Sequence, residues 1–209
     1  MVSKTEEART GGSPDGGTMN RQYKPVEFMR KKNMKWLRKA DHSMFVWCNQ
    51  KVNHIVLDWL FGLITHMGGA TFTILCAVLV IWYAPDDWGA VGLQSLAALA
   101  LSHVIAVIIK KKMRRIRPFH VMQQARVGKF PLKDYSFPSG HTTAIFAFVT
   151  PFLFLSTQGV ALLLIIFAGL VAFSRVYWGY HYPTDCVAGG TIGMGTALLV
   201  VYMTNSLLT

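Results

Sequence analysis

The chain has 209 residues, 52% of them hydrophobic, and its formal net charge is +11 at pH 7. A mean hydropathy of +0.35 is too apolar for an ordinary soluble domain of this length, so one membrane-embedded domain is the better expectation. The basic residues flank apolar runs without any nucleic-acid-binding motif, which argues against nucleic acid as a partner and favours anionic membrane lipid.

The N-terminal part of the chain divides into two segments. Residues 1–18 are rich in Gly, Ser, Thr and charge and contain almost nothing to bury, so we expect a disordered leader, with Met19 as an alternative native start. In residues 19–56, basic side chains such as Lys35 are interleaved with aromatic ones such as Trp36. This pattern is typical of an amphipathic helix in the lipid headgroup layer, and the alternative is a simple basic tail.

Residues 57–209 carry the apolar runs expected of a membrane-embedded domain. A helix of ~20 residues crosses the hydrocarbon layer, and the candidate spans are residues 60–83, 89–109, 141–155, 160–173 and 186–203. The third and fourth runs are short, which fits helices that end at the lipid interface. The predicted fold is therefore all-α: a polytopic membrane helical bundle with about five transmembrane helices plus the N-terminal interfacial helix.

Several residues within these runs are notable. Gly68 and Gly69 are weak points of the first span, and the glycines of the last span should let helices approach closely. His66 and His103 lie within the first two spans, and we expect structural roles for them.

The ends of four spans should lie on one face of the membrane. The second span is followed by Arg117, the third begins at His141, the fourth is followed by Arg175 and the fifth begins at Asp185. Because successive spans alternate in direction, these ends fall on the same side. Polar residues from distant segments are therefore expected to converge.

Lys110 and Arg117 form the first group of candidate site residues. They are seven residues apart, or two helical turns, so both point the same way if the helix continues until Pro118 ends it. Their basic neighbours, Arg115 included, are interpreted as the positive flank of a span. Alternatively, the whole cluster, including Lys110 and Arg117, is only the positive flank of a span.

Ser139, Gly140 and His141 form the second group. Ser139 is placed as the N-cap of the third span, and the free backbone N–H groups of the next two residues suit an anion. His141 can donate a proton to a departing oxygen and later take one from water. A capped helix without further function is the alternative.

Ser174 to Asp185 form the third group. Pro183 suits the first position of a helix, which puts Asp185 in the first turn, one turn beyond His181. A carboxylate bound to one ring nitrogen fixes the tautomer and leaves the other nitrogen as a nucleophile. Alternatively, the pair only holds the loop together.

Taken together, these residues suit attack on phosphorus. Lys110, Arg117 and Arg175 would hold the non-bridging oxygens, Ser139 and the Gly140 amide would add hydrogen bonds, and the two histidines would flank the phosphorus. The only carboxylates in the converging segments are Asp134 and Asp185, too few to hold magnesium while orienting His181. We therefore expect metal-independent chemistry without a cofactor.

Three motifs resemble those of the type 2 phosphatidic acid phosphatase superfamily, in the same order. They are Lys-x6-Arg-Pro at 110–118, Pro-Ser-Gly-His at 138–141 and Ser-Arg-x5-His-x3-Asp at 174–185. The resemblance implies a helical bundle in which His181 becomes a phosphohistidine, Asp185 supports it, and His141 acts as acid and then base. It further implies that Lys110, Arg117, Ser139, Gly140, His141 and Arg175 contact phosphate.

The resemblance leaves the substrate open. Members of this superfamily include lipid phosphatases, undecaprenyl diphosphate phosphatases, glucose-6-phosphatases and soluble haloperoxidases. The hydrophobicity of this chain disfavours a soluble haloperoxidase. Many lipid phosphatases of this type have six spans, whereas the short bacterial diphosphatases have fewer, so a prenyl diphosphate is the first choice. Phosphatidic acid or phosphatidylglycerophosphate is the alternative, and a non-catalytic lipid-binding protein is a further one. Arg126, Lys129 and Lys133 could bind a second phosphate or the membrane surface.

The location expected is the cell membrane, but the side of the active site stays open. With five spans every lysine and arginine falls on the catalytic side, which the positive-inside rule places in the cytoplasm. Relatives that recycle cell-wall lipid carriers work on the outer face.

Overall fold

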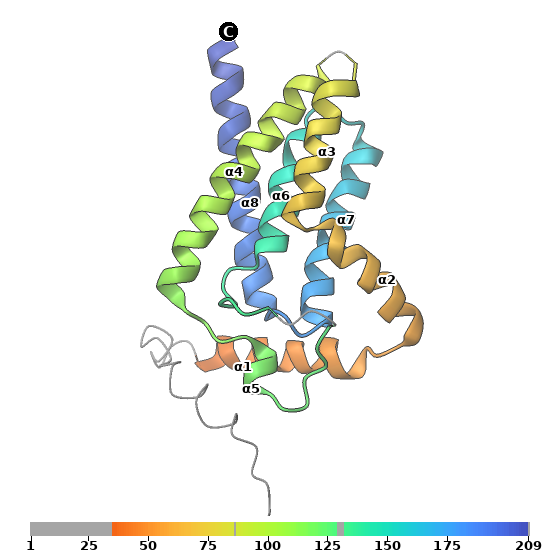
Figure 1. Cartoon of the computed structure of the whole chain (residues 1–209), viewed down its shortest axis with the longest axis vertical. Helices are drawn as coiled ribbons and strands as arrows, with labels where there is room; N and C mark the ends of the chain where they lie inside the picture. Colours follow the sequence, from red (N-terminus) through yellow and green to blue (C-terminus); the bar gives the residue numbers. More distant parts are fainter. Residues whose placement is uncertain (1–34, 86, 129–131, 209) are drawn as a thin grey trace, which may run out of the picture.

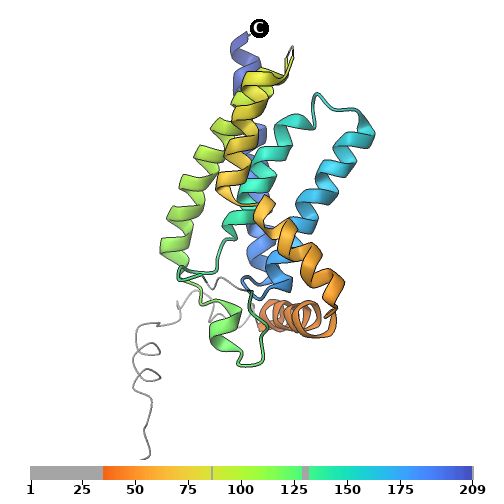
Figure 2. The same cartoon turned by 45° about the vertical axis from the view of Figure 1, so that its right-hand side comes forward.

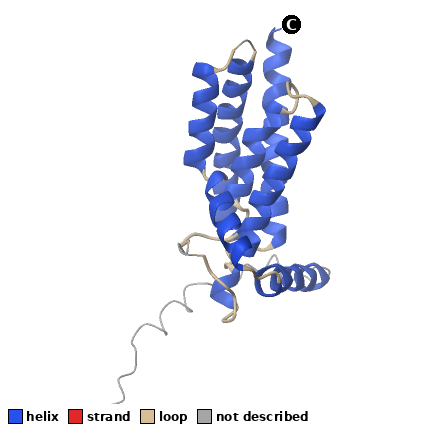
Figure 3. Cartoon of the chain, turned by 90° about the vertical axis from the view of Figure 1, so that its right-hand side faces the viewer, coloured by secondary structure: helices blue, strands red, loops and turns tan. Residues whose placement is uncertain are grey.

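The structure is a computed structural model, and it describes residues 35–85, 87–128 and 132–208. All regular structure in these residues is helical (Figure 3). In chain order the elements are α1 (Lys35–Val46), the π-helix η4 (Trp47–Lys51), α2 (Ile55–Met67), α3 (Ala70–Tyr83), α4 (Trp88–Met113), α5 (Pro118–Val121), α6 (Gly140–Phe152), α7 (Gln158–Tyr177) and α8 (Pro183–Leu208). The all-α prediction is confirmed, whereas the leader 1–18 lies outside the described residues.

The helix α6 is the centre of the bundle. It packs against α4, α7 and α8, and the long helices run roughly side by side around it (Figure 1). The approach of α8 to α6 requires a small residue, because a Cβ atom at Gly193 would lie 2.3 Å from the backbone oxygen of Thr143. Gly189 and Gly193 therefore serve close helix packing, as the sequence indicates, whereas a Cβ atom at Gly195 would meet nothing within 4 Å.

Three helical segments of the described chain are long and apolar enough to cross a membrane: residues 88–121, 158–177 and 183–206. The pair α2 and α3 qualifies as a fourth span only if its two helices are counted together. The helix α6 has 13 residues, fewer than the ~20 that a full crossing needs. The number of crossings therefore stays a prediction.

The first expected span is not one straight helix. It breaks after Met67, and α2 and α3 meet at an angle of 60° (Figure 2). The break lies against the rest of the bundle: a Cβ atom at Gly68 would lie 2.3 Å from the side chain of Val171 and 3.3 Å from the backbone oxygen of His141. Two glycines at 68 and 69 thus let the chain turn while it passes the start of α6.

The helix α1, continued by η4, lies across one end of the bundle (Figure 1). Its inner face carries Asp41 and Phe45, both buried, whereas Trp36 and Met44 are exposed. This division is the one expected of an amphipathic interfacial helix. The location of α1 in a headgroup layer stays a prediction.

The helix α4 ends earlier than expected. Its last residue is Met113, and Arg114 adopts the left-handed conformation with φ = 44°. Arg117 is therefore not on α4, and Pro118 begins the short helix α5 instead of ending α4. The expected alignment of Lys110 and Arg117 on one helix face is wrong.

Candidate active site

The four helix ends do meet at one place, at the end of the bundle where α1 lies (Figure 1). Three hydrogen bonds tie the segments together. The backbone nitrogen of Ser139 donates to the backbone oxygen of Asp185 (3.0 Å), and that of Ser136 donates to the oxygen of Arg115 (2.8 Å). The Nη1 atom of Arg117 donates to the oxygen of Tyr180 (2.8 Å). The three motifs thus form one cluster.

His181 lies in the connection between α7 and α8, with its side chain 1% exposed. Its Nδ1 atom is 2.7 Å from the backbone oxygen of Ser136, and its Nε2 atom is 3.1 Å from Nη1 of Arg117. A carbonyl can only accept and a guanidinium can only donate, so the proton is on Nδ1 and Nε2 carries a lone pair. This is the tautomer that a nucleophilic imidazole needs.

The surroundings of His181 also keep the ring neutral. Burial lowers its pKa to about 3, with the positive charges of Arg117 and Arg175 adding to the effect and Asp185 opposing it. The ring is therefore uncharged at neutral pH. An uncharged ring has the free electron pair that attack on phosphorus requires.

The carboxylate of Asp185 is fully buried but does not hydrogen-bond directly to His181. The distance from its Oδ2 to Nδ1 of His181 is 3.7 Å. Instead, Oδ2 accepts from the Ser136 hydroxyl and from the backbone nitrogen of Tyr182 (2.9 Å), and Oδ1 accepts from Nη1 of Arg115 (2.6 Å). The expected hydrogen bond from His181 to Asp185 does not form, because Nδ1 has a single proton and donates it in a hydrogen bond to the Ser136 carbonyl. The negative charge remains next to the ring.

Lys110 and Arg117 come together on a third residue, Asp134. Its carboxylate accepts from Nζ of Lys110 (2.6 Å) and from Nη2 of Arg117 (2.6 Å). Burial alone would raise the pKa of Asp134, but the hydrogen bond from Lys110 and the charge of Arg117 lower it to about 2. A carboxylate thus pairs with two of the three cations that the sequence assigns to phosphate.

Arg175, at the end of α7, is buried and only partly satisfied. Its Nη1 atom donates to the hydroxyl of Thr65 (2.6 Å), and its guanidinium lies 4.4 Å from the centre of the Tyr180 ring. Its Nε atom has no hydrogen-bond partner among the described residues. A buried cation with a spare donor is suited to an anionic ligand.

The start of α6 has the shape expected of an anion site. Ser139 is the N-cap and is buried, although its hydroxyl accepts from Thr142 (3.0 Å) and does not cap the helix. A Cβ atom added at Gly140 would meet nothing within 4 Å, so there is open space beside this amide. The first N–H groups of a helix have no intrahelical acceptor. An oxyanion can approach them here.

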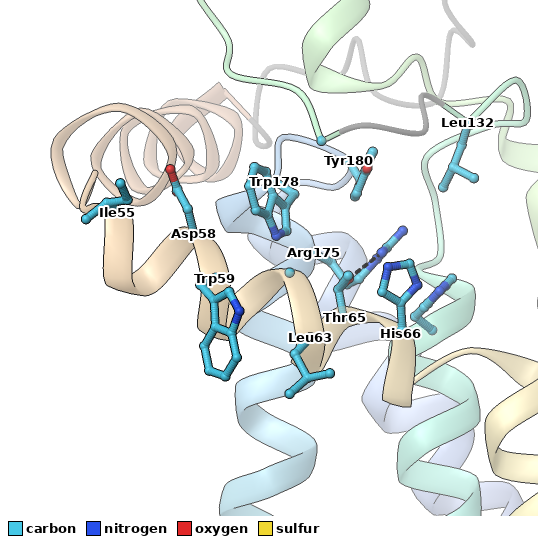
Figure 4. A pocket seen from close by; sticks show the side chains of 13 residues that line it. Ile55, Asp58, Trp59, Leu63, Thr65, His66, Leu132, Arg175, Trp178 and Tyr180 are labelled. Carbon is cyan, nitrogen blue, oxygen red and sulfur yellow. Dashed lines mark hydrogen bonds between the residues drawn. The ribbon is translucent and has the colours of Figure 1, made fainter.

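A cavity of about 880 Å³ lies beside these groups, between α2 and the end of α7 (Figure 4). His141 and Arg175 line it, and so do Thr65 and His66 of α2. The rest of the lining is largely apolar: Ile55, Trp59, Leu63, Leu132 and Trp178, together with Asp58, Gly62, Gly128 and Tyr180. Figure 4 shows the side chain of His66 directed toward Arg175, and the structural role expected of this histidine stays a prediction. The cavity has a cationic end and an apolar end.

Some residues near the site were not found from the sequence. Arg115, interpreted as membrane flank, is buried against Asp185 and Asp41. Arg126 forms an ion pair with Asp58 (2.8 Å), so a second phosphate would have to compete with that carboxylate. Nothing in the run of basic residues distinguishes Arg115 from Arg114, because the difference arises from contacts with remote segments. Thr65 and His66 carried no motif that would reveal them.

Among the described residues, no group of three or more His, Cys, Asp or Glu side chains is placed to hold a metal ion. Independence from metal stays a prediction, which a chelator can test.

The sequence model of the PAP2 superfamily matches residues 91–208, which include all three motifs. An undecaprenyl-diphosphatase from Sulfolobus acidocaldarius is 34% identical over 112 residues, 52% of this chain and 54% of that protein. A decaprenylphosphoryl-5-phosphoribose phosphatase from Mycolicibacterium smegmatis is 40% identical over 103 residues, 49% of this chain and 52% of that protein. The chain thus spans about half the length of these relatives.

Solved structures show the same fold. LpxE from Aquifex aeolicus has a TM-score of 0.70 at 22% identity, covering 77% of this chain and 93% of that one. A transmembrane PAP2-type phosphatidylglycerolphosphate phosphatase from Bacillus subtilis has a TM-score of 0.69 at 22% identity, covering 86% and 90%. The resemblance inferred from the motifs is confirmed, and the fold is that of a multi-pass membrane protein.

Proposed function

Because the chain belongs to the PAP2 superfamily, we propose that it is an integral-membrane phosphatase that hydrolyses a lipid phosphate or diphosphate through a phosphohistidine on His181. The observation that carries the proposal is the state of this residue: a buried, neutral imidazole with its Nε2 lone pair beside Arg117. Binding alone would need cations but not such a nucleophile.

The reaction has two steps. In the first, Nε2 of His181 attacks phosphorus, the bond from phosphorus to the leaving oxygen breaks, and His141 gives that oxygen a proton. In the second, water attacks the phosphohistidine, His141 takes the proton of the water, and the phosphorus–nitrogen bond breaks to release inorganic phosphate. Asp185 and the Ser136 carbonyl stabilise the positive charge that grows on the ring.

The cations supply charge stabilisation. Lys110, Arg117 and Arg175 bind the non-bridging oxygens, with the Gly140 amide and Ser139 contributing hydrogen bonds. Since Asp134 already pairs with Lys110 and Arg117, the phosphate group must compete with that carboxylate. We propose that no metal ion or other cofactor takes part.

The first-choice substrate is a prenyl diphosphate such as undecaprenyl diphosphate, hydrolysed in the cell membrane. The cavity, with Arg175 at one end and aliphatic and aromatic side chains at the other, supports an amphiphilic lipid, and the Sulfolobus relative is an undecaprenyl-diphosphatase. Phosphatidic acid or phosphatidylglycerophosphate is the alternative. It is favoured by a phosphatidylglycerophosphatase B from Bacillus subtilis, 28% identical over 153 residues, 66% of this chain and 70% of that protein.

The test is phosphate release by the protein in detergent from undecaprenyl diphosphate, phosphatidic acid and phosphatidylglycerophosphate. Wild type and His181→Ala are compared, with exposed Asp87→Asn as a control at the opposite end of the bundle. We expect release by wild type and the control, undiminished by a chelator, and none by His181→Ala. Equal release by His181→Ala would show that the nucleophile is misassigned. Activity lost in a chelator and restored by magnesium would contradict metal independence.

A further inference from the structure

We infer that Arg115 and Asp41 are positioning residues for the carboxylate of Asp185, and that α1 is thereby a working part of the active site. This inference rests on the proposed function. It concerns two residues outside the three motifs, one of them on the helix that lies across the end of the bundle.

Arg115 bridges two buried carboxylates. Its Nη1 atom donates to Oδ1 of Asp185 (2.6 Å), and its Nη2 atom donates to Oδ2 of Asp41 (2.5 Å). The guanidinium carbon lies 3.9 Å from the centre of the Tyr182 ring. The side chains of Arg115, Asp41 and Asp185 are 13%, 2% and 0% exposed. Solvent screening is therefore weak, and the contacts fix the plane of the guanidinium.

Asp41 is anchored to the same turn that carries Asp185. Its Oδ1 accepts from the backbone nitrogen of Thr184 (2.9 Å), and its Oδ2 accepts from the hydroxyl of Thr184 (2.7 Å). Thr184 is the second residue of α8, so a side chain from α1 satisfies one of the free N–H groups at the start of α8. An anion is favoured at this end of a helix.

The chain of contacts continues to the nucleophile through Ser136. The Ser136 hydroxyl donates to Asp185, and its carbonyl accepts from Nδ1 of His181 (2.7 Å). The Ser136 nitrogen donates in turn to the backbone oxygen of Arg115 (2.8 Å). Arg115 therefore holds both the carboxylate and the segment that fixes the tautomer of His181.

Removing Arg115 would release Asp185 on one side. Of its hydrogen bonds to the described residues, those from Ser136 and the Tyr182 nitrogen would remain, both at Oδ2. Two buried carboxylates would also lose the cation that they share, which favours rotation of Asp185 away from His181. The effect should fall on turnover, because Asp185 acts on charge that develops on the ring and does not touch the lipid.

The experiment compares Arg115→Gln, Arg115→Lys and Asp41→Asn with Lys112→Gln, which removes one charge from an exposed residue of the same basic run. All are assayed as full-length protein in detergent. Their thermal unfolding is measured alongside. We expect kcat to fall by on the order of tenfold to hundredfold in Arg115→Gln and by a smaller factor in Asp41→Asn. KM should stay within about twofold, since phosphate is held by other cations. Lys112→Gln should match wild type.

Two further results decide between positioning and general stability. Arg115→Lys keeps the charge but cannot give two carboxylates a nitrogen each in the same geometry, so kcat should be only partly restored. The double variant Arg115→Gln/Asp41→Asn should be no slower than Arg115→Gln alone, because both act through one contact chain. If Arg115→Gln does not fold, the kcat values of Arg115→Lys and Asp41→Asn are compared with that of Lys112→Gln instead.

A kcat equal to that of Lys112→Gln in the folded Arg115 and Asp41 variants would overturn the inference, and so would losses in the double variant that multiply. These outcomes leave the proposed function intact, provided that wild type releases phosphate and His181→Ala does not. Release by His181→Ala would instead defeat the proposed function.

Discussion

The guanidinium of Arg117 donates from Nη1 to Nε2 of His181 over 3.1 Å. The cation expected to bind phosphate thus contacts the atom expected to attack it. The same guanidinium is held on its other side by the carboxylate of Asp134. Exchange of one anion, Asp134, for another, the phosphate group, would leave Arg117 close to the reacting nitrogen.

Asp134→Asn should strengthen binding of inorganic phosphate or vanadate. The substitution removes the negative charge that competes for Lys110 and Arg117. We expect the competitive inhibition constant to fall by about tenfold, which corresponds to ~1.4 kcal/mol. Inhibition of lipid hydrolysis measures it, with Asp87→Asn as a control. An unchanged constant would mean that Asp134 does not compete with the ligand.

Asp185→Asn should slow turnover more than it weakens binding. An amide keeps the size of the side chain but loses the charge, and its nitrogen would face donors from Ser136, Tyr182 or Arg115. We expect kcat to fall on the order of hundredfold while KM changes by a few-fold at most. Steady-state kinetics in detergent give both values. If the variant changed only KM, Asp185 would have no role in the chemical step.

Gly140→Ala should leave the fold intact and impair catalysis. A Cβ atom at this position meets nothing within 4 Å of the protein, so the methyl group would occupy the space in which an oxyanion approaches the start of α6. We expect an unfolding temperature at or above that of wild type, since alanine favours helix, and a several-fold rise in KM. Gly169→Ala, also unobstructed in the middle of α7, is the matched control. Wild-type KM in Gly140→Ala would refute close approach at this amide.

The low pKa of His181 predicts how stability depends on pH. In the unfolded chain an ordinary histidine takes up a proton below about pH 6.5, whereas burial keeps the folded-state pKa near 3. The folded state therefore loses stability as pH falls from about 6.5 toward 3, by up to ~1.4 kcal/mol per pH unit for this one group. Between pH 7 and 5 the unfolding temperature of His181→Asn should fall less than that of wild type.

The control for this experiment is His42→Asn, an exposed position on α1, which should follow wild type. Equal decline in all three proteins would mean that His181 titrates normally. The same low pKa also implies that protonation of His181 does not set an acid limb of kcat/KM near pH 6.5.

The sequence predicted which segments come together because their polar residues are unusual where they stand. Arg175, His181 and Asp185 lie at one connection between two apolar runs, where charges are costly unless they serve one another. Alternation of the spans predicted that this connection meets Arg117 and His141 at one end of the bundle. Local spacing decided these positions, so no tertiary information was needed. The N-cap at Ser139 and the helix start at Pro183 follow from the same local rules.

What the sequence could not supply depends on contacts between distant segments. The hydrogen-bond partner of His181 is the Ser136 carbonyl, 45 positions away, and any residue at that position has a carbonyl. The early end of α4 at Met113 follows from the path that Arg115 takes toward Asp185 and Asp41. The bend at Gly68 was visible as a weak point, but its angle of 60° is set by the packing of Val171 and His141.

For the lipid substrate proposed above, the bend between α2 and α3 would also determine where the hydrocarbon tail leaves the protein. Trp59 and Leu63 of the oblique helix α2 line the cavity together with Arg175, and both also have exposed side chains. A tail that emerges past these two side chains would enter the bilayer close to the phosphate. The enzyme would then recognise the headgroup and the first isoprene or acyl units. The rest of the tail would stay in the membrane and contribute little to substrate specificity.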